Sequence, residues 1–114
     1  MRYRLEIPAQ LPPLAISPEA RHNVFLAAKE AVTNVVRHAG ASEVLIRLRV
    51  GTNDFALEIQ DNGRGPAGMA GKTARNGLRN MRSRMEDIGG KFEIEAAPKG
   101  GTIVRLTVPA IKRS

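Results

Sequence analysis

The side chains of Glu30, Asn34, Arg37 and His38 would lie on one side of an α-helix, because helical neighbours are spaced three and four residues apart. Farther along the chain, the segment DNGRG at 61–65 combines an aspartate with a glycine-rich turn. Carboxylate and carboxamide oxygens suit Mg²⁺, and basic side chains suit phosphate groups. A packed core requires none of these groups, so the combination predicts a site that binds Mg-ATP.

Asn34 is the least ordinary member of this polar stripe, because asparagine in mid-helix competes for backbone hydrogen bonds. A helix that tolerates it is expected to use the carboxamide oxygen, for example as a ligand to Mg²⁺. The alternatives are that the stripe simply meets water and that His38 is a cation at the helix end. The side chains predicted to pack on a sheet lie on the opposite side of the helix: Phe25, Ala28, Val32, Val35 and Val36.

Asp61 offers a way to recognise a base. Its carboxylate can accept a hydrogen bond from the exocyclic amine of adenine and would repel the carbonyl of guanine. Gly63 and Gly65 would let the backbone approach the base closely. The alternative interpretation is an ordinary Asp-Asn-Gly turn.

A basic segment follows this turn and contains no Asp or Glu between Asn62 and Met85. Together with the net charge of +7, it favours polyanionic partners, although the shortage of aromatic residues argues against single-stranded nucleic acid. Gly77 is predicted to begin a helix whose free N–H groups, assisted by Arg75, would bind phosphate. Lys72 would reach phosphates as a mobile point charge, and the alternative is a solvated basic face.

Two known phosphate-binding motifs nearly match the glycine-rich segment. Gly63-x-Gly65-x-x-Gly68 fits the dinucleotide pattern, but its last glycine should open a helix and residues 66–71 are poor helix material. The run 71–73, Gly-Lys-Thr, resembles the end of a P-loop, but Pro66 occupies the position of the first glycine and 76–77 would interrupt the helix. Both matches are therefore interpreted as coincidences.

The composition limits the classes of protein that this chain could belong to. The chain has 114 residues, of which 42% are apolar, and this suits one compact domain. No stretch approaches the roughly 20 apolar residues that cross a bilayer, so no membrane segment is expected in this chain. Cysteine is absent, which excludes disulfides and fits a cytoplasmic location.

The pattern along the chain predicts a strand, a helix, a hairpin, a long loop, a second helix and a final hairpin. This order predicts an α+β fold, a two-layer sandwich in which helices cover one face of a mixed, mostly antiparallel sheet. Ser17 is a good N-cap for the first helix, and Gly40 is placed to end it. The expected elements are an edge strand at 3–7, a helix at 18–39, strands at 44–50 and 55–59, a loop at 62–76, a helix from 77 to Gly89-Gly90, and strands at 92–96 and 103–108.

Taken in order, four segments resemble the GHKL superfamily of ATP-binding domains. They are KEAVTNVVRHA at 29–39, DNGRG at 61–65, NGLRNMRSR at 76–84 and GGT at 100–102. Within the superfamily the chain is most similar to the catalytic domain of two-component sensor histidine kinases of the nitrate-sensor type. One departure is Asn76, where many relatives have another glycine.

The resemblance implies a role for each matching residue. Asn34 would hold Mg²⁺, and Glu30 would polarise the reacting group or support the metal. Asp61 would bind adenine, and the remaining contacts to ATP would come from Arg37, His38, Gly63, Gly65, Lys72, Arg75, Gly77, Leu78 and Thr102.

The resemblance also implies partners. ATP would donate its γ-phosphate to a histidine on a separate dimerisation domain, and a response regulator would act downstream. Because His22 and His38 are poor acceptors, residues 1–114 are interpreted as a single catalytic domain excised from a longer, homodimeric kinase. The alternatives are an anti-sigma-factor-type serine kinase, a module that senses ATP without catalysis, and a basic nucleic-acid-binding domain.

Overall fold

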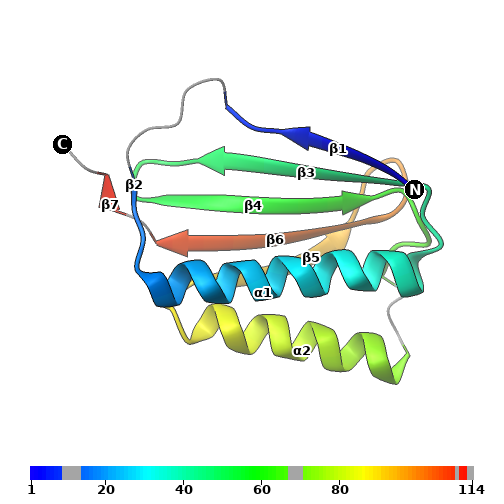
Figure 1. Cartoon of the computed structure of the whole chain (residues 1–114). Coiled ribbons are helices and arrows are strands. Elements are labelled where there is room, and N and C mark those ends of the chain that lie inside the picture. The colour runs from blue at the N-terminus through cyan, green and yellow to red at the C-terminus, as the bar shows by residue number, and fades with distance from the viewer. Residues whose placement is uncertain (9–13, 67–70, 110, 113–114) are drawn as a thin grey trace.

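The chain folds into two layers, a five-stranded sheet and two helices on one of its faces (Figure 1). The computed structural model describes residues 1–8, 14–66, 71–109 and 111–112. Its elements are β1 Arg2–Glu6, β2 Leu14–Ala15, α1 Pro18–Asn34, the π-helix η1 Val35–Ala39, β3 Glu43–Val50, β4 Asp54–Asp61, α2 Lys72–Glu86, β5 Lys91–Ala96, β6 Thr102–Pro109 and β7 Ile111–Lys112.

The sheet has the strand order β1-β3-β4-β6-β5. β3 pairs with β4, β4 with β6 and β5 with β6, all antiparallel, whereas β1 pairs with β3 in parallel and forms an edge. The predicted α+β sandwich, with a mixed and mostly antiparallel sheet, is therefore confirmed. The short antiparallel pair β2–β7 was not predicted.

The first helix begins and ends where the sequence predicts. Ser17 is the N-cap, its Oγ accepts a hydrogen bond from Ala20 N at 3.0 Å, and Pro18 occupies the first turn. Gly40 ends the helical run in the left-handed conformation, with φ of 62°. The last turn, η1, is a π-helix that the sequence did not predict; such turns occur frequently at functional sites.

The core lies between α1 and the sheet. On the helix it is built from small residues, Ala20, Ala27 and Ala31 among them, which let α1 approach the strands closely. The prediction that Phe25 and Val36 pack on the sheet is therefore wrong, because these side chains are 63% and 57% exposed. Of the other residues predicted on that side, Val35 is buried, while Ala28 and Val32 are partly buried.

The second helix begins earlier than predicted. α2 starts at Lys72 with Gly71 as its N-cap, so the predicted loop at 62–76 is shorter and Gly77 lies inside the helix. Gly77 is buried against α1, and this packing outweighs the helix cost of glycine, about 1 kcal/mol. The expected interruption at 76–77, used against the P-loop, is therefore wrong; Pro66 remains the departure from that motif. Gly68, which the dinucleotide pattern requires, lies outside the described residues.

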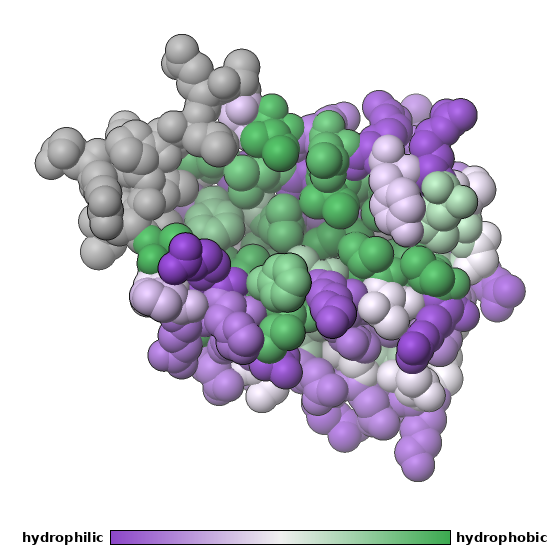
Figure 2. Space-filling view, viewed as in Figure 1, coloured by the Kyte–Doolittle hydropathy of each residue, from purple (hydrophilic) through white to green (hydrophobic). Residues whose placement is uncertain are grey.

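Part of the helix-bearing face of the sheet carries exposed apolar side chains. In Figure 2, viewed as Figure 1, apolar residues gather over the strands beside α1. On β1 and just beyond it, Tyr3, Leu5 and Ile7 are 57%, 67% and 57% exposed. In the described part of the chain, no helix has the length and apolar character needed to cross a membrane.

Candidate functional site

Three residues of the predicted site meet where α1 and α2 touch. Gly77 packs so closely on α1 that a Cβ there would collide with Glu30 Oε1 and lie 3.2 Å from Asn34 Nδ2. Asn34 is 3% exposed, so the alternative that it simply meets water is wrong. Glu30 is only partly buried. The structure therefore brings together a carboxylate, a carboxamide and a helix backbone with no side chain between them.

The buried amide nitrogen of Asn34 has no hydrogen-bond partner. Its Nδ2 is one of three buried side-chain polar atoms without a partner in the described part of the chain, the others being His38 Nε2 and Thr102 Oγ1. Buried polar groups are normally paired, and an unpaired one calls for an explanation such as a missing ligand or water. All three residues belong to the site predicted from the sequence.

Asp61 ends β4 and is buried beside Thr102. Its carboxylate accepts hydrogen bonds from Gly63 N, at 2.8 Å, and from the backbone of Thr102. Burial nevertheless raises the pKa of Asp61 above its ordinary value, because desolvation outweighs these bonds. The charged form of this buried carboxylate therefore lowers the stability of the folded domain. Perturbed pKa values of this kind cluster at functional sites.

Close backbone packing around the Asp61 carboxylate requires glycine at several positions. A Cβ on Gly63 would collide with the carbonyl of Ala39, and one on Gly101 would collide with the carbonyl of Asp61. Gly65 has a φ of 84°, a conformation that favours glycine. The sequence identified Gly63 and Gly65 but attributed the need for glycine there to contact with a base, and it included Gly101 in the GGT segment without assigning it a role.

The remaining predicted residues are spread around this centre. Arg37 on η1, and Lys72 and Arg75 in the first turns of α2, are exposed. Leu78 is partly buried and packs against the core. The predicted role of Gly77 as a helix start with free N–H groups is wrong, because α2 begins at Lys72 and exposes its N-terminal N–H groups there.

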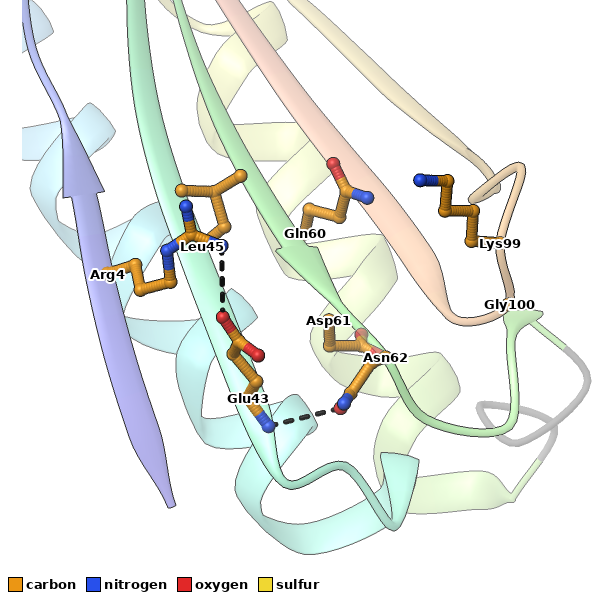
Figure 3. Close-up of a pocket in the computed structure, with 8 residues that line it drawn as sticks. All are labelled: Arg4, Glu43, Leu45, Gln60, Asp61, Asn62, Lys99 and Gly100. Carbon is orange, nitrogen blue, oxygen red and sulfur yellow. Dashed lines mark hydrogen bonds and ion pairs between the residues drawn. The ribbon is translucent and has the colours of Figure 1, made fainter.

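A separate hollow of about 250 Å³ lies on the face of the sheet that carries no helix. Figure 3 shows Arg4, Glu43, Leu45 and Gln60 in front of the strands, with the helices behind them. Arg4 Nη1 already donates to Glu43 Oε1 at 3.2 Å. Asp61 also lines this hollow, but Glu30, Asn34 and Gly77 do not, and these lie between the sheet and the helices or where the helices touch.

The sequence pattern shared by histidine kinase-, DNA gyrase B- and HSP90-like ATPases matches residues 20–112. The chain belongs to this ATPase family. The match spans α1, the turn after β4, α2 and the last hairpin, the elements that carry the polar residues described above. The predicted membership in the GHKL superfamily is therefore confirmed.

Sensor kinases are among the proteins that the chain resembles. It is similar to sensor histidine kinase LiaS of Bacillus subtilis (strain 168), with 34% identity over 95 residues, 83% of this chain and 26% of LiaS. It is also similar to the nitrate/nitrite sensor protein NarX of Escherichia coli (strain K12), with 30% identity over 105 residues, 92% of this chain and 18% of NarX. The chain thus spans about a quarter of these relatives or less.

The fold is shared with solved histidine kinases. The histidine kinase domain of the blue-light activated kinase of Erythrobacter litoralis EL346 superposes with a TM-score of 0.72 and 20% identity, over 95% of this chain and 51% of that chain. At this level of identity the similarity concerns the fold. It agrees with the arrangement of two helices on a mixed five-stranded sheet.

Proposed function

We propose that this ATPase-family domain binds Mg-ATP between α1, α2 and the end of β4, as the catalytic domain of a sensor histidine kinase. The observation that carries the proposal is the buried and unpaired amide nitrogen of Asn34, adjacent to Glu30 and Gly77. A polar group in this position is costly in the free protein, and a bound ligand would satisfy it.

The donors around Asn34 fit Mg²⁺. Glu30 offers a carboxylate and Asn34 a carboxamide oxygen, since the O and N of an amide can exchange places by a flip. Within the described residues, no group of three or more His, Asp or Glu side chains could hold a metal alone. This suits an ion that takes one or two protein ligands and completes its shell with phosphate oxygens and water. When bound, Mg²⁺ would neutralise charge on the phosphates.

Asp61 supports adenine as the base. It lies at the end of β4, is nine-tenths buried or more, and would accept a hydrogen bond from the exocyclic amine of adenine. The unpaired Thr102 Oγ1 lies beside it and would face the same end of the ligand. Guanine presents a carbonyl at the position of the amine and would be rejected.

Basic residues support binding of the triphosphate. His38 and Arg37 follow Asn34 on η1, while Lys72 and Arg75 lie at the start of α2. The N-terminal N–H groups of α2 and its dipole would add to their attraction for phosphate. Catalysis would consist mainly of positioning and charge neutralisation, as in phosphoryl transfer generally.

The proposal extends to partners. The γ-phosphate would pass to a histidine on a separate dimerisation domain, and a response regulator would receive it from there. The relatives LiaS and NarX are much longer than this chain, which supports a catalytic domain that works within a longer kinase. A homodimeric kinase with this domain in the cytoplasm is part of the same proposal.

Calorimetry with Mg-ATP and Mg-GTP tests the proposal. We expect the wild type to bind Mg-ATP at least about tenfold more tightly than Mg-GTP, a difference of roughly 1.4 kcal/mol. Asp61→Ala should abolish binding, whereas Asp87→Ala, which removes an exposed carboxylate after α2, should leave it unchanged. An absence of Mg-ATP binding, or equal binding by Asp61→Ala, would refute the nucleotide site.

Phosphate transfer needs its own experiment. Supplied with a histidine-containing dimerisation domain, the protein should produce acid-labile phosphohistidine. Acid-stable phosphoserine on a supplied acceptor would instead favour an anti-sigma-factor-type serine kinase. Tight Mg-ATP binding without any transfer would favour a module that only senses ATP.

A further inference from the structure

The side chain of Asn62 forms hydrogen bonds that connect the turn after β4 to the loop before β3. Its Oδ1 accepts hydrogen bonds from Ser42 N and Glu43 N, both at 3.0 Å, and its Nδ2 donates to Ser42 Oγ at 3.0 Å. Figure 3 shows Asn62 turned toward Glu43 N at the start of β3. One side chain thus links two loops that are far apart in the sequence.

Two neighbouring contacts act on the same pair of loops. Arg64 N donates to Ala39 O at 2.8 Å, and Gly63 packs directly on that carbonyl. Ala39 is the last residue of η1 and follows His38. The segment 61–65 is therefore attached to the C-terminal end of the helix that carries Asn34.

We propose that Asn62 is a positioning residue for the nucleotide, setting the spacing between Asp61 and the metal and phosphate end at Asn34 and His38. This inference rests on the proposed function. Asn62 is exposed and its carboxamide bonds to the protein, whereas the adjacent Asp61 is buried and faces the opposite side of the sheet. Asn62 therefore acts through Asp61 and not through its own contact with a ligand.

The chemistry of the carboxamide explains why asparagine suits this position. Its oxygen accepts two backbone N–H bonds while its nitrogen donates to a hydroxyl. Aspartate would keep the acceptor, and the Ser42 hydroxyl could turn to donate to it. Alanine would remove all three bonds, leaving the turn free to shift relative to the helix end.

The test compares Asn62→Ala, Asn62→Asp and Glu58→Gln by calorimetry with Mg-ATP and Mg-GTP, well below the melting temperature of each variant. Glu58 lies on the face of the sheet that carries no helix, where it pairs with Arg49 and Arg105, so its loss lowers stability without touching the turn. We expect Asn62→Ala to bind Mg-ATP about tenfold more weakly and to lose part of its preference for adenine. Asn62→Asp should stay within about threefold of the wild type.

Several outcomes would overturn the inference while leaving the proposed function intact. One is wild-type affinity and preference in Asn62→Ala when Asp61→Ala no longer binds. Others are an equal loss of affinity in Glu58→Gln, which would indicate general destabilisation, and failure of Asn62→Asp to restore binding. If the wild type itself binds no Mg-ATP, the proposed function fails instead.

Discussion

The backbone of Gly77 lies directly against the carboxylate of Glu30, so that a Cβ at residue 77 would collide with Glu30 Oε1. The same Cβ would lie 3.2 Å from Nδ2 of Asn34, which is 3% exposed. A ligand bound at Asn34 would therefore lie close to this contact between α1 and α2. Substitutions at the contact should affect both the packing of the helices and the proposed site.

Gly77→Ala should change stability by less than about 1 kcal/mol, because two effects oppose each other. Helix propensity favours alanine by about 1 kcal/mol, whereas the new Cβ would push the Glu30 carboxylate aside and lie 3.2 Å from the buried Asn34 Nδ2. Urea unfolding of the two single variants and of the Gly77→Ala/Glu30→Ala double variant measures the interaction energy between the two positions. In the Glu30→Ala background the Gly77→Ala substitution should become more favourable than in the wild type. The same effect with and without Glu30 would contradict the contact.

Asn34→Ala should separate metal binding from folding. Because Asn34 Nδ2 has no partner, its removal should change the free energy of unfolding by less than about 1 kcal/mol, while the dependence of ATP affinity on Mg²⁺ disappears. Asn23 is the matched control: it is also buried on α1, but its Nδ2 donates to Arg84 O at 2.9 Å. Asn23→Ala should lose about 1–3 kcal/mol and keep the Mg²⁺ dependence. Unfolding of Asn34→Ala would show a structural role.

Asp61→Asn should stabilise the domain at neutral pH and weaken Mg-ATP binding. Burial raises the pKa of Asp61, so folding favours its protonated form. Its contribution to stability is present below the ordinary aspartate pKa and is lost as the pH rises through the higher folded pKa. The gain should be roughly 0.5–2 kcal/mol at pH 7 and should vanish at low pH, as measured by urea unfolding across pH. If Asp61→Asn raised the free energy of unfolding equally at all pH values, the raised pKa of Asp61 would not be the cause.

Glu58→Gln should show the opposite dependence on pH. Burial alone would raise the pKa of Glu58, but hydrogen bonds from Arg105 and Arg49, at 2.7 and 2.8 Å, hold it below its ordinary value. Its stabilising effect is present above the ordinary glutamate pKa and is lost as the pH falls through the folded pKa. The substitution should cost about 1–3 kcal/mol at pH 7 and less in acid.

An exposed glutamate on the same face provides the comparison for Glu58. Glu93 lies 3.9 Å from Arg105 and is 55% exposed, so Glu93→Gln should change stability by less than about 0.5 kcal/mol. Equal losses in the two variants would mean that burial of Glu58 contributes nothing.

The sequence predicted the elements of the site better than their packing. The spacing of Glu30 and Asn34, the cap at Ser17 and the turn at 61–65 are local patterns, and local patterns determine helix limits and turns. The sequence did not predict which face of α1 packs on the sheet. That choice depends on which residues let the helix approach the strands most closely, and here the small alanines face the sheet while Phe25 stays exposed.

Contacts between distant segments account for the other failures. Gly77 was expected to start a helix, but it lies inside α2, where it packs against Glu30 of α1. The bonds from Asn62 to Ser42 and Glu43 join two loops that no sequence pattern connects. Only the folded sheet brings these groups together.

The edge position of β1 has a consequence for where the domain opens first. Among the described strands, β1 has β3 as its one neighbour in the sheet, and all five of its residues are exposed. Its amides should therefore exchange hydrogen fastest within the sheet. The proposed nucleotide site uses α1, β4, α2 and β6, so it would stay intact while the first strand of the chain is transiently released.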